Sequence, residues 1–311
     1  MATSGTMVQK PDPFRKNRPH RQEGGTDVAG FRNPTETIPG HRMRKDLGQH
    51  FLRDTLVLQS VVGGADLQPG QRVLEVGPGP GNLTERLAKA VGTEGTVVSI
   101  EADPTLAAHL QGKWPNVQLV VGDAVQVDLA SFGRFDRIVA NLPYLISGPI
   151  TIAFLDLLRA PATRWDQAVL MYQAEFAQRL LAKAGDGSYG RLSVHAARWV
   201  ATEWVRDVHP AAFDPPPKVD SMVVRLIPHP TPPFEVKDEA LWRAVVDGSF
   251  QQRRKQMRNT VPDAVAGHRV QRDQALATLE SIGLSSERPE QVPPATFAEL
   301  ANRLAEAGRG A

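Results

Sequence analysis

The feature that most constrains the fold is an alternation of short β-branched runs with amphipathic helical patterns in the middle of the chain. The runs predicted as strands are Arg72–Val76, Thr96–Ile100, Val117–Val121, Phe135–Ala140 and Gln167–Tyr172. The patterns between and after them predict helices over Leu83–Val91, Leu106–Trp114, Ile150–Leu158 and Glu175–Ala184. Strands separated by helices form right-handed crossovers and a mainly parallel sheet. We therefore expect a doubly wound α/β domain whose ligand site lies beyond the carboxyl ends of the strands.

The rest of the sequence predicts two flanking parts. Residues 1–42 are rich in Pro, Gly, Thr, Arg and His, lack apolar periodicity and are predicted to form a disordered basic tail. After a further strand predicted over Met222–Ile227, the prolines of Pro230–Pro233 break the pattern. The sequence then becomes helical, with turns expected at Val261-Pro262, Gly283 and Pro293-Pro294. The expected organisation is a tail over 1–42, an α/β domain over 43–228 and a small all-α domain over 229–311.

Composition excludes several classes of protein. The 311 residues contain no cysteine, which rules out a disulfide scaffold, a thiolate zinc site and a cysteine nucleophile. Cysteine-free composition also suits a reducing compartment. No apolar run reaches the roughly 18 residues that span a bilayer, and no hydrophobic signal core follows the first charges. We therefore expect a cytoplasmic protein with no membrane partner.

A glycine-rich loop follows the first predicted strand. It reads Glu75-Val76-Gly77-Pro78-Gly79-Pro80-Gly81-Asn82 and leads directly into a predicted helix. Glycines at alternate positions let a backbone turn tightly and approach a ligand, and the helix start offers free N–H groups. The loop matches neither the dinucleotide pattern nor the phosphate-binding P-loop. Alone it fits a nucleotide-like ligand about as well as a turn without a ligand.

Two acidic residues end the next two strands. Glu101 follows Ile100 at the position where a carboxylate can accept both ribose hydroxyls of an adenosine. Asp123 follows Val121-Gly122 at the same edge, where it can accept a hydrogen bond from an adenine amine. Either residue can instead cap a helix. Together with the glycine-rich loop they favour an adenosyl cofactor.

The fourth strand ends in Asn141-Leu142-Pro143-Tyr144. The exocyclic amine of adenine is a weak nucleophile because its lone pair is delocalised into the ring, so acceptors must hold its hydrogens. The Asn141 side chain and a carbonyl of Leu142 or Pro143 can do this, and the proline fixes the backbone between them. Tyr144 offers a face for stacking a flipped base. Methyl transfer at such a site relies on proximity and electrostatics, so we expect no metal.

Several separated blocks carry a resemblance to a known family. They are Lys45-Asp46-Leu47-Gly48-Gln49-His50-Phe51-Leu52, the loop Gly77–Asn82 with Leu83 and Thr84, the turn Asn141–Tyr144, Tyr189–Ser193, Phe213–Ser221, and Phe250–Lys255 with Arg258-Asn259. In this order the chain resembles the KsgA-type ribosomal RNA adenine-N6,N6-dimethyltransferases from about residue 43 onward. The resemblance implies a Rossmann-like S-adenosylmethionine-dependent methyltransferase domain. It also implies dimethylation of two adjacent adenosines in the hairpin near the 3′ end of small-subunit ribosomal RNA, with a role in small-subunit biogenesis.

The resemblance also implies site residues and partners. The methyl donor is expected to contact His50, Leu52, Gly77, Gly79, Glu101, Asp123 and Asn141. The target base is expected at Asn141, Leu142, Pro143 and Tyr144, with Phe213 as the second wall of a sandwich around it. RNA contacts are expected from Arg253, Arg254, Lys255 and Arg258, which we place on a positive cleft between the two domains. We expect a monomer whose partners are the small subunit and its RNA.

Three positions depart from the common family pattern, and other functions remain open. His50 and Leu145 stand where Asn is common, and Gly148 stands where a hydroxyl residue is usual. The alternatives are a macrolide-resistance-type adenine-N6 methyltransferase of large-subunit RNA, a DNA or nucleoside adenine methyltransferase, and a ribosome assembly factor without catalysis. The intact turn at 141–144 argues against the last of these.

Overall fold

The computed structural model describes residue 38 and residues 49–309, and its strands confirm the predicted α/β class. The strands are β1 (Phe51–Leu52), β2 (Arg72–Val76), β3 (Thr96–Glu101), β4 (Val117–Val121), β5 (Arg137–Asn141), β6 (Gln167–Gln173), β7 (Val200–Val208), β8 (Phe213–Asp214) and β9 (Ser221–Pro228). The main helices are α1 (Thr55–Ala65), α2 (Asn82–Val91), α3 (Pro104–Leu110), α4 (Ser147–Leu157), α5 (Ala174–Leu181), α6 (Arg191–Trp199), α7 (Glu239–Gln251), α8 (Val261–Ala264), α9 (Arg272–Ser281) and α10 (Pro294–Arg309).

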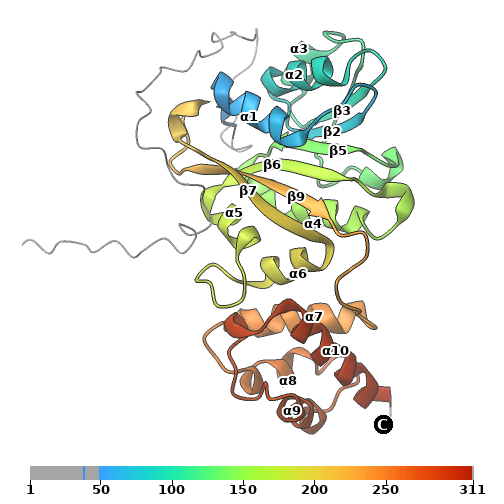
Figure 1. Cartoon of the computed structure of the whole chain (residues 1–311), viewed down its shortest axis with the longest axis vertical. Coiled ribbons are helices and arrows are strands. Elements are labelled where there is room, and N and C mark those ends of the chain that lie inside the picture. Colours follow the sequence, from blue (N-terminus) through green and yellow to red (C-terminus); the bar gives the residue numbers. More distant parts are fainter. Residues whose placement is uncertain (1–37, 39–48, 310–311) are drawn as a thin grey trace, which may run out of the picture.

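Within the described residues the central sheet has seven strands in the order β4-β3-β2-β5-β6-β9-β7 (Figure 1). The strands from β4 to β6 are parallel, whereas β9 runs antiparallel to β6 and β7 antiparallel to β9. From β2 the chain builds the sheet outward in one direction, through β3 and β4, and it then returns to place β5 on the other side of β2. Ligands of doubly wound sheets bind at such a switch point, beyond the carboxyl ends of the strands.

Both faces of the sheet are covered because successive side chains of a buried strand point to opposite sides. On one face Val73, Val139 and Val169 pack with α1 and α2. On the other face Leu74, Ile138 and Leu170 pack with α4 and α5. All six side chains are fully buried. The strands are therefore continuous apolar runs, which is how the sequence predicted them.

The C-terminal helices form a separate hydrophobic cluster, below α6 in Figure 1. Trp242 of α7 and Phe297 of α10 lie at its centre, and Tyr189 from the segment before α6 packs into it. The turn expected at Val261-Pro262 is wrong: α8 begins there, and proline is well suited to the first turn of a helix. The predicted turn at Pro293-Pro294 coincides with the start of α10.

Several helix and strand boundaries differ from the predicted ones. Helix α3 ends at Leu110, before Gly112 with its φ of 73°, so Trp114 lies outside it. Helix α5 ends at Leu181 because Ala182 is extended. Neither α1 nor the α6–β7 pair was predicted. Apart from Ile38, the predicted basic tail lies outside the described residues, and no helix within the described part is long and apolar enough to cross a membrane.

Candidate functional site

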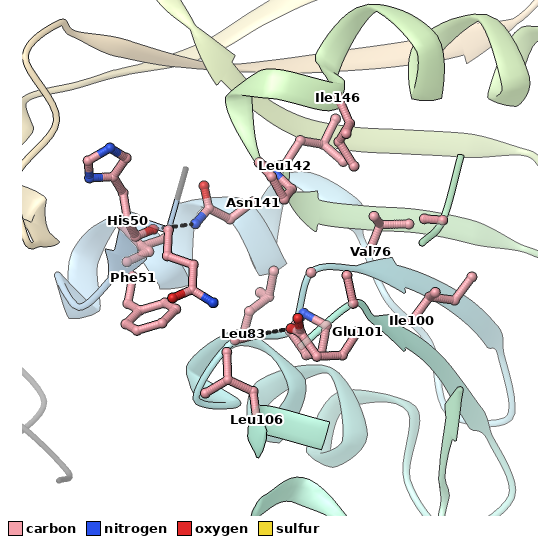
Figure 2. A pocket seen from close by; sticks show the side chains of 18 of the residues that line it. His50, Phe51, Val76, Leu83, Ile100, Glu101, Leu106, Asn141, Leu142 and Ile146 are labelled. Atoms are coloured by element: carbon pink, nitrogen blue, oxygen red, sulfur yellow. Dashed lines mark hydrogen bonds between the residues drawn. The ribbon is translucent and has the colours of Figure 1, made fainter. Parts of the chain in front are cut away.

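A cavity lies at the carboxyl ends of β2, β3, β4 and β5, at the switch point of the sheet (Figure 2). Apolar side chains from β2, β3, α3 and the turn after β5 form much of its wall: Val76, Ile100, Leu106, Leu142 and Ile146. The predicted residues that line it are His50, Leu52, Gly77, Gly79, Glu101, Asp123, Asn141, Leu142, Pro143 and Tyr144. The fold thus brings together residues that the sequence separates by more than 90 positions.

The glycine-rich loop forms one wall with its backbone. Gly77 and Gly79 have φ values of 70° and 58°, in the left-handed region that favours glycine. A Cβ on Gly79 would lie 3.0 Å from the Phe51 ring, and one on Gly77 would lie 3.2 Å from the Pro143 ring. The loop therefore contacts both β1 and the turn at 141–144, with no room for side chains between them.

Glu101 is buried where β3 ends, with only 6% of its surface exposed. Its Oε2 accepts the Gly79 N–H at 3.0 Å (Figure 2), and its Oε1 accepts the Asp103 N–H at 2.9 Å. Burial raises the pKa of Glu101, although these backbone hydrogen bonds act to lower it. Each carboxylate oxygen can accept a second hydrogen bond, so the side chain fits the two hydroxyls of a ribose.

Glu75 lies below the loop. Its Oε2 accepts hydrogen bonds from Thr84 Oγ1 at 2.8 Å and Ser99 Oγ at 2.5 Å, whereas its Oε1 has no partner among the described residues. Burial raises its pKa from 4.5 to about 7, against the lowering effect of the two hydroxyls. This carboxyl connects α2 and β3 behind the cavity. No role was predicted for Glu75 from the sequence.

Asp123 both lines the cavity and caps a turn, and its contact with an adenine stays a prediction. It lines the cavity after β4, and its Oδ1 also accepts the Val125 N–H at 2.9 Å, which caps the following turn. Its Oδ2 accepts from the Gln126 side chain at 3.2 Å. Together with the apolar wall this carboxylate suits the edge of an adenine ring.

The Asn141 amide has a fixed orientation. Its Nδ2 donates to the backbone carbonyl of His50 at 3.3 Å (Figure 2), so Oδ1 is left as an acceptor. Nearby, the Pro143 carbonyl already accepts the Ile146 N–H at 3.1 Å. The turn therefore presents a side-chain oxygen and the Leu142 carbonyl as available acceptors for an amine.

Tyr144 begins a short 3-10 turn, Tyr144–Ile146, beside this amide. Its hydroxyl is 2.6 Å from Ser221 Oγ, the buried first residue of β9. Burial raises the Tyr144 pKa, and the bond to Ser221 acts against that rise. The anchored hydroxyl holds the ring in place as a flat apolar surface. Gln49 also lines the cavity, and its side chain donates to Asp103 at 3.2 Å. Both Gln49 and Ser221 belong to the sequence blocks that resemble the family, but neither was predicted as a site residue.

The structure does not bring Phe213 to the cavity. Phe213 is 4% exposed and pairs with Leu52 across β1 and β8, within the cluster that covers α1. The ring beside Tyr144 is His50, with ring centroids 5.7 Å apart and planes tilted by 31°. In this conformation Phe213 supports β1 from behind.

The predicted RNA-contacting residues lie away from the cavity, after the end of α7. Arg253 is paired with Glu290 at 2.9 Å and also donates to the Asp186 carbonyl at 3.4 Å. Arg254, Lys255 and Arg258 are exposed. Arg253 lines a second cavity, between α5, α6 and α7, whereas the other three basic residues do not. All four residues follow α7, which ends at Gln251.

The residues that line the cavity fit an adenosyl group beside a base that carries an exocyclic amine. The loop, Glu101 and Asp123 supply a backbone wall and acceptors for a ribose and an adenine, while Asn141 and Tyr144 supply an acceptor and a stacking face. Among residues 49–309 no cluster of three or more His, Asp or Glu side chains could hold a metal ion.

Sequence comparison gives consistent matches. The family pattern described as ribosomal RNA adenine dimethylase matches residues 40–304. A ribosomal RNA small subunit methyltransferase A of Pseudomonas aeruginosa is 39% identical over 272 residues, covering 86% of this chain and 96% of that protein. A probable ribosomal RNA small subunit methyltransferase A of Methanosarcina barkeri is 38% identical over 259 residues, covering 82% and 86%.

Solved structures match over most of the chain as well. A dimethyladenosine transferase from Plasmodium falciparum superposes with a TM-score of 0.70 and 27% identity, covering 83% of this chain and 98% of that one. The 23S rRNA methyltransferase ErmE superposes with a TM-score of 0.59 and 29% identity, covering 82% and 99%. These likenesses extend through the C-terminal helices, beyond the sheet alone.

Proposed function

Because the chain belongs to the ribosomal RNA adenine dimethylase family, we propose that it dimethylates the N6 amines of two adjacent adenosines in the hairpin near the 3′ end of small-subunit ribosomal RNA. The chain is an rRNA adenine dimethyltransferase, and S-adenosylmethionine is the methyl donor that its class of enzyme uses. The observation that carries the finer proposal is the Asn141 amide, which lines the cavity and whose Nδ2 donates to the His50 carbonyl, so that Oδ1 is left as an acceptor.

The donor is held by the residues around the glycine-rich loop. Glu101 accepts the ribose hydroxyls and Asp123 the adenine amine, while Gly77 and Gly79 let the backbone lie against the ligand. Leu52 and the His50 backbone close the cavity from β1. When bound, the donor would supply an electrophilic methyl carbon.

The turn at 141–144 prepares the amine for attack. Asn141 Oδ1 and the Leu142 carbonyl accept its two N–H groups, which directs the nitrogen lone pair toward the methyl carbon. We favour Leu142 over Pro143 as the second acceptor because the Pro143 carbonyl is already used by Ile146. Tyr144 stacks against the base, a contact worth roughly 1–3 kcal/mol per base.

The exposed basic residues after α7 suit contact with folded RNA. Arg254, Lys255 and Arg258 lie on the surface of the C-terminal helices, and phosphate contacts of this kind recognise RNA by shape. Arg253 instead stabilises the fold through Glu290. We assign the catalytic domain to 43–228 and the RNA-binding domain to 229–311, and we expect a monomer acting on the small subunit.

The names of the relatives leave one alternative to test. The sequence relatives at 38–39% identity are named for the small subunit, whereas ErmE is named for 23S RNA. Labelled donor is incubated with undermethylated small subunits, with large subunits and with adenine-containing DNA, followed by nucleoside analysis. We expect N6,N6-dimethyladenosine in the small subunit alone, located in the 3′-terminal hairpin. Label in the large subunit would support the ErmE-like function, and binding without label would support an assembly factor.

A further inference from the structure

The His50 imidazole has one defined hydrogen-bonding arrangement. Its Nδ1 lies 2.9 Å from the backbone carbonyl oxygen of Pro215. A carbonyl oxygen only accepts hydrogen bonds, so Nδ1 carries the hydrogen and donates it. In the neutral ring the lone pair therefore lies on Nε2, for which the described residues provide no hydrogen-bond partner.

The backbone around His50 is fixed to the catalytic turn. The His50 carbonyl accepts the Asn141 amide, and the neighbouring Phe51 pairs with Asp214 between β1 and β8. Arg53 strengthens this pairing through an ion pair with Asp214 at 2.6 Å. The imidazole thus keeps its position relative to Asn141.

The ring lies on the side of the target base. Figure 2 shows the imidazole on the far side of the Asn141 side chain from Glu101, which belongs to the donor part of the cavity. Its centroid is 5.7 Å from that of Tyr144, the proposed stacking surface for the base. His50 is the one imidazole among the described residues that line this cavity.

We infer that the His50 imidazole accepts, through Nε2, the proton that the target amine releases, an inference that rests on the proposed function. As the nitrogen–carbon bond forms, the carbon–sulfur bond breaks and sulfur keeps the electron pair. The nitrogen becomes cationic and must lose one proton. Asn141 and Leu142 hold its hydrogens but an amide is too weak a base to remove one. His50 takes the proton and passes it to water.

If His50 has this role, its charge also affects how well the protein binds the positively charged donor. An imidazolium at this position repels a sulfonium and has no lone pair to offer. The other groups that face His50 do not replace it: the Tyr144 hydroxyl is bonded to Ser221, and Arg53 and Asp214 neutralise each other. Glu101 and Asp123 lie in the donor part of the cavity.

The first test compares the binding of S-adenosylmethionine and S-adenosylhomocysteine by calorimetry at about pH 5.5 and about pH 8, across the range where histidines titrate. The two ligands share the ribose and adenine contacts and differ in the charge on sulfur. On going from the higher to the lower pH, we expect the affinity for S-adenosylmethionine to fall on the order of tenfold further than the affinity for S-adenosylhomocysteine. His50→Asn, whose amide can still donate to the Pro215 carbonyl, removes the difference. If the wild-type affinities for the two ligands change with pH in the same way, the inference about His50 is wrong. The proposed function is not affected by that result.

The second test measures single-turnover methylation of small subunits against pH. The wild type loses rate at low pH, and His50→Asn loses this dependence together with part of its rate at high pH. Added imidazole restores the methylation rate of His50→Ala in proportion to the fraction of the imidazole that is neutral. It leaves the methylation rate of His50→Asn unchanged. An unaltered pH profile in His50→Asn, with no rescue of His50→Ala, would show that the ring takes no proton. Absence of methylation in every variant and the wild type would instead contradict the proposed function.

Discussion

At the scale of single residues, Glu75 shows how strongly burial governs this site. Glu75 is 1% exposed, receives two hydroxyl hydrogen bonds on one carboxyl oxygen and, among the residues that the structure describes, none on the other. With its pKa raised to about 7, Glu75 of the folded protein is mainly the protonated acid below that pH. The stability that this preference supplies is complete below pH 4.5, the ordinary value, and is lost as the pH rises through about 7.

Replacing Glu75 by Gln removes this titration. We expect the free energy of unfolding of Glu75→Gln, relative to the wild type, to increase between about pH 5 and pH 8 by roughly 3 kcal/mol at most. Urea denaturation across this range measures it. Glu85→Gln, at an exposed position of α2, is the control and should show no comparable change. A constant difference between Glu75→Gln and the wild type across the range would mean that Glu75 is already ionised in the fold.

At the scale of elements, the cavity depends on how closely the glycine-rich loop approaches β1. The Gly79 position combines a φ of 58° with a distance of 3.0 Å from its would-be Cβ to the Phe51 ring. A side chain there must strain the backbone or displace β1, which directly follows His50, whose carbonyl accepts the Asn141 amide. The loop and the catalytic turn are thus connected through a strand of two residues.

We expect Gly79→Ala to weaken donor binding on the order of tenfold, because a left-handed non-glycine residue alone costs roughly 1–2 kcal/mol. Calorimetry measures the affinity. Gly63→Ala is the matched control, since Gly63 lies in α1 with nothing within 4 Å of its would-be Cβ. That variant should gain about 0.5–1 kcal/mol of stability and bind the donor normally. Equal donor affinity in both variants would contradict a close-approach role for the loop.

The sequence predicts long elements well and short contacts poorly. The strands from β2 to β6 follow from apolar runs, and Glu101 and Asn141 follow from the ends of those runs. A two-residue strand such as β1 has no periodicity to detect, so its pairing with β8 could be seen only in the structure. Helix α1 was missed because its apolar residues do not gather on one face, although Asp54 caps it through the Leu56 and Val57 N–H groups.

At the scale of the whole molecule, an ion-pair cluster joins α7 of the C-terminal helices to α6 and to the segment after α4. Glu239, the first residue of α7, accepts from Arg198 of α6 at 2.5 Å and from Arg159 after α4 at 2.9 Å. The Arg198 guanidinium also lies over Trp242, 5.3 Å from its ring centre. Burial acts to raise the Glu239 pKa, but the arginines together lower it, so the carboxylate stays charged.

Glu239→Ala is expected to lower the free energy of unfolding by roughly 2–3 kcal/mol, because it leaves the nearly buried Arg198 without its partner. Chemical denaturation measures the loss. Asp263→Ala breaks the well-exposed pair with Arg272 and should cost less than about 1 kcal/mol. Similar losses in the two variants would show that the cluster does not hold the two parts together.

The same scale explains why two predicted site residues lie outside the main cavity. Phe213 and Arg253 lie in blocks that resemble the family, but sequence alone does not tell whether a side chain faces a cavity or the interior. Phe213 packs behind Leu52, and Arg253 pairs with a glutamate distant in sequence. Both outcomes depend on long-range contacts, whereas Glu101 and Asn141 are placed by the strands that precede them.

The role proposed for Asn141 is to hold the target amine, with only a minor contribution to binding the donor that it also contacts. It is tested most directly by measuring, for Asn141→Ala, both the single-turnover rate on undermethylated small subunits and the affinity for S-adenosylmethionine. We expect the rate to fall on the order of 10²–10³-fold, as for the loss of one preorganised polar group, with donor affinity changed less than about threefold. A rate close to that of the wild type, or a loss of rate matched by an equal loss of donor affinity, would contradict the account.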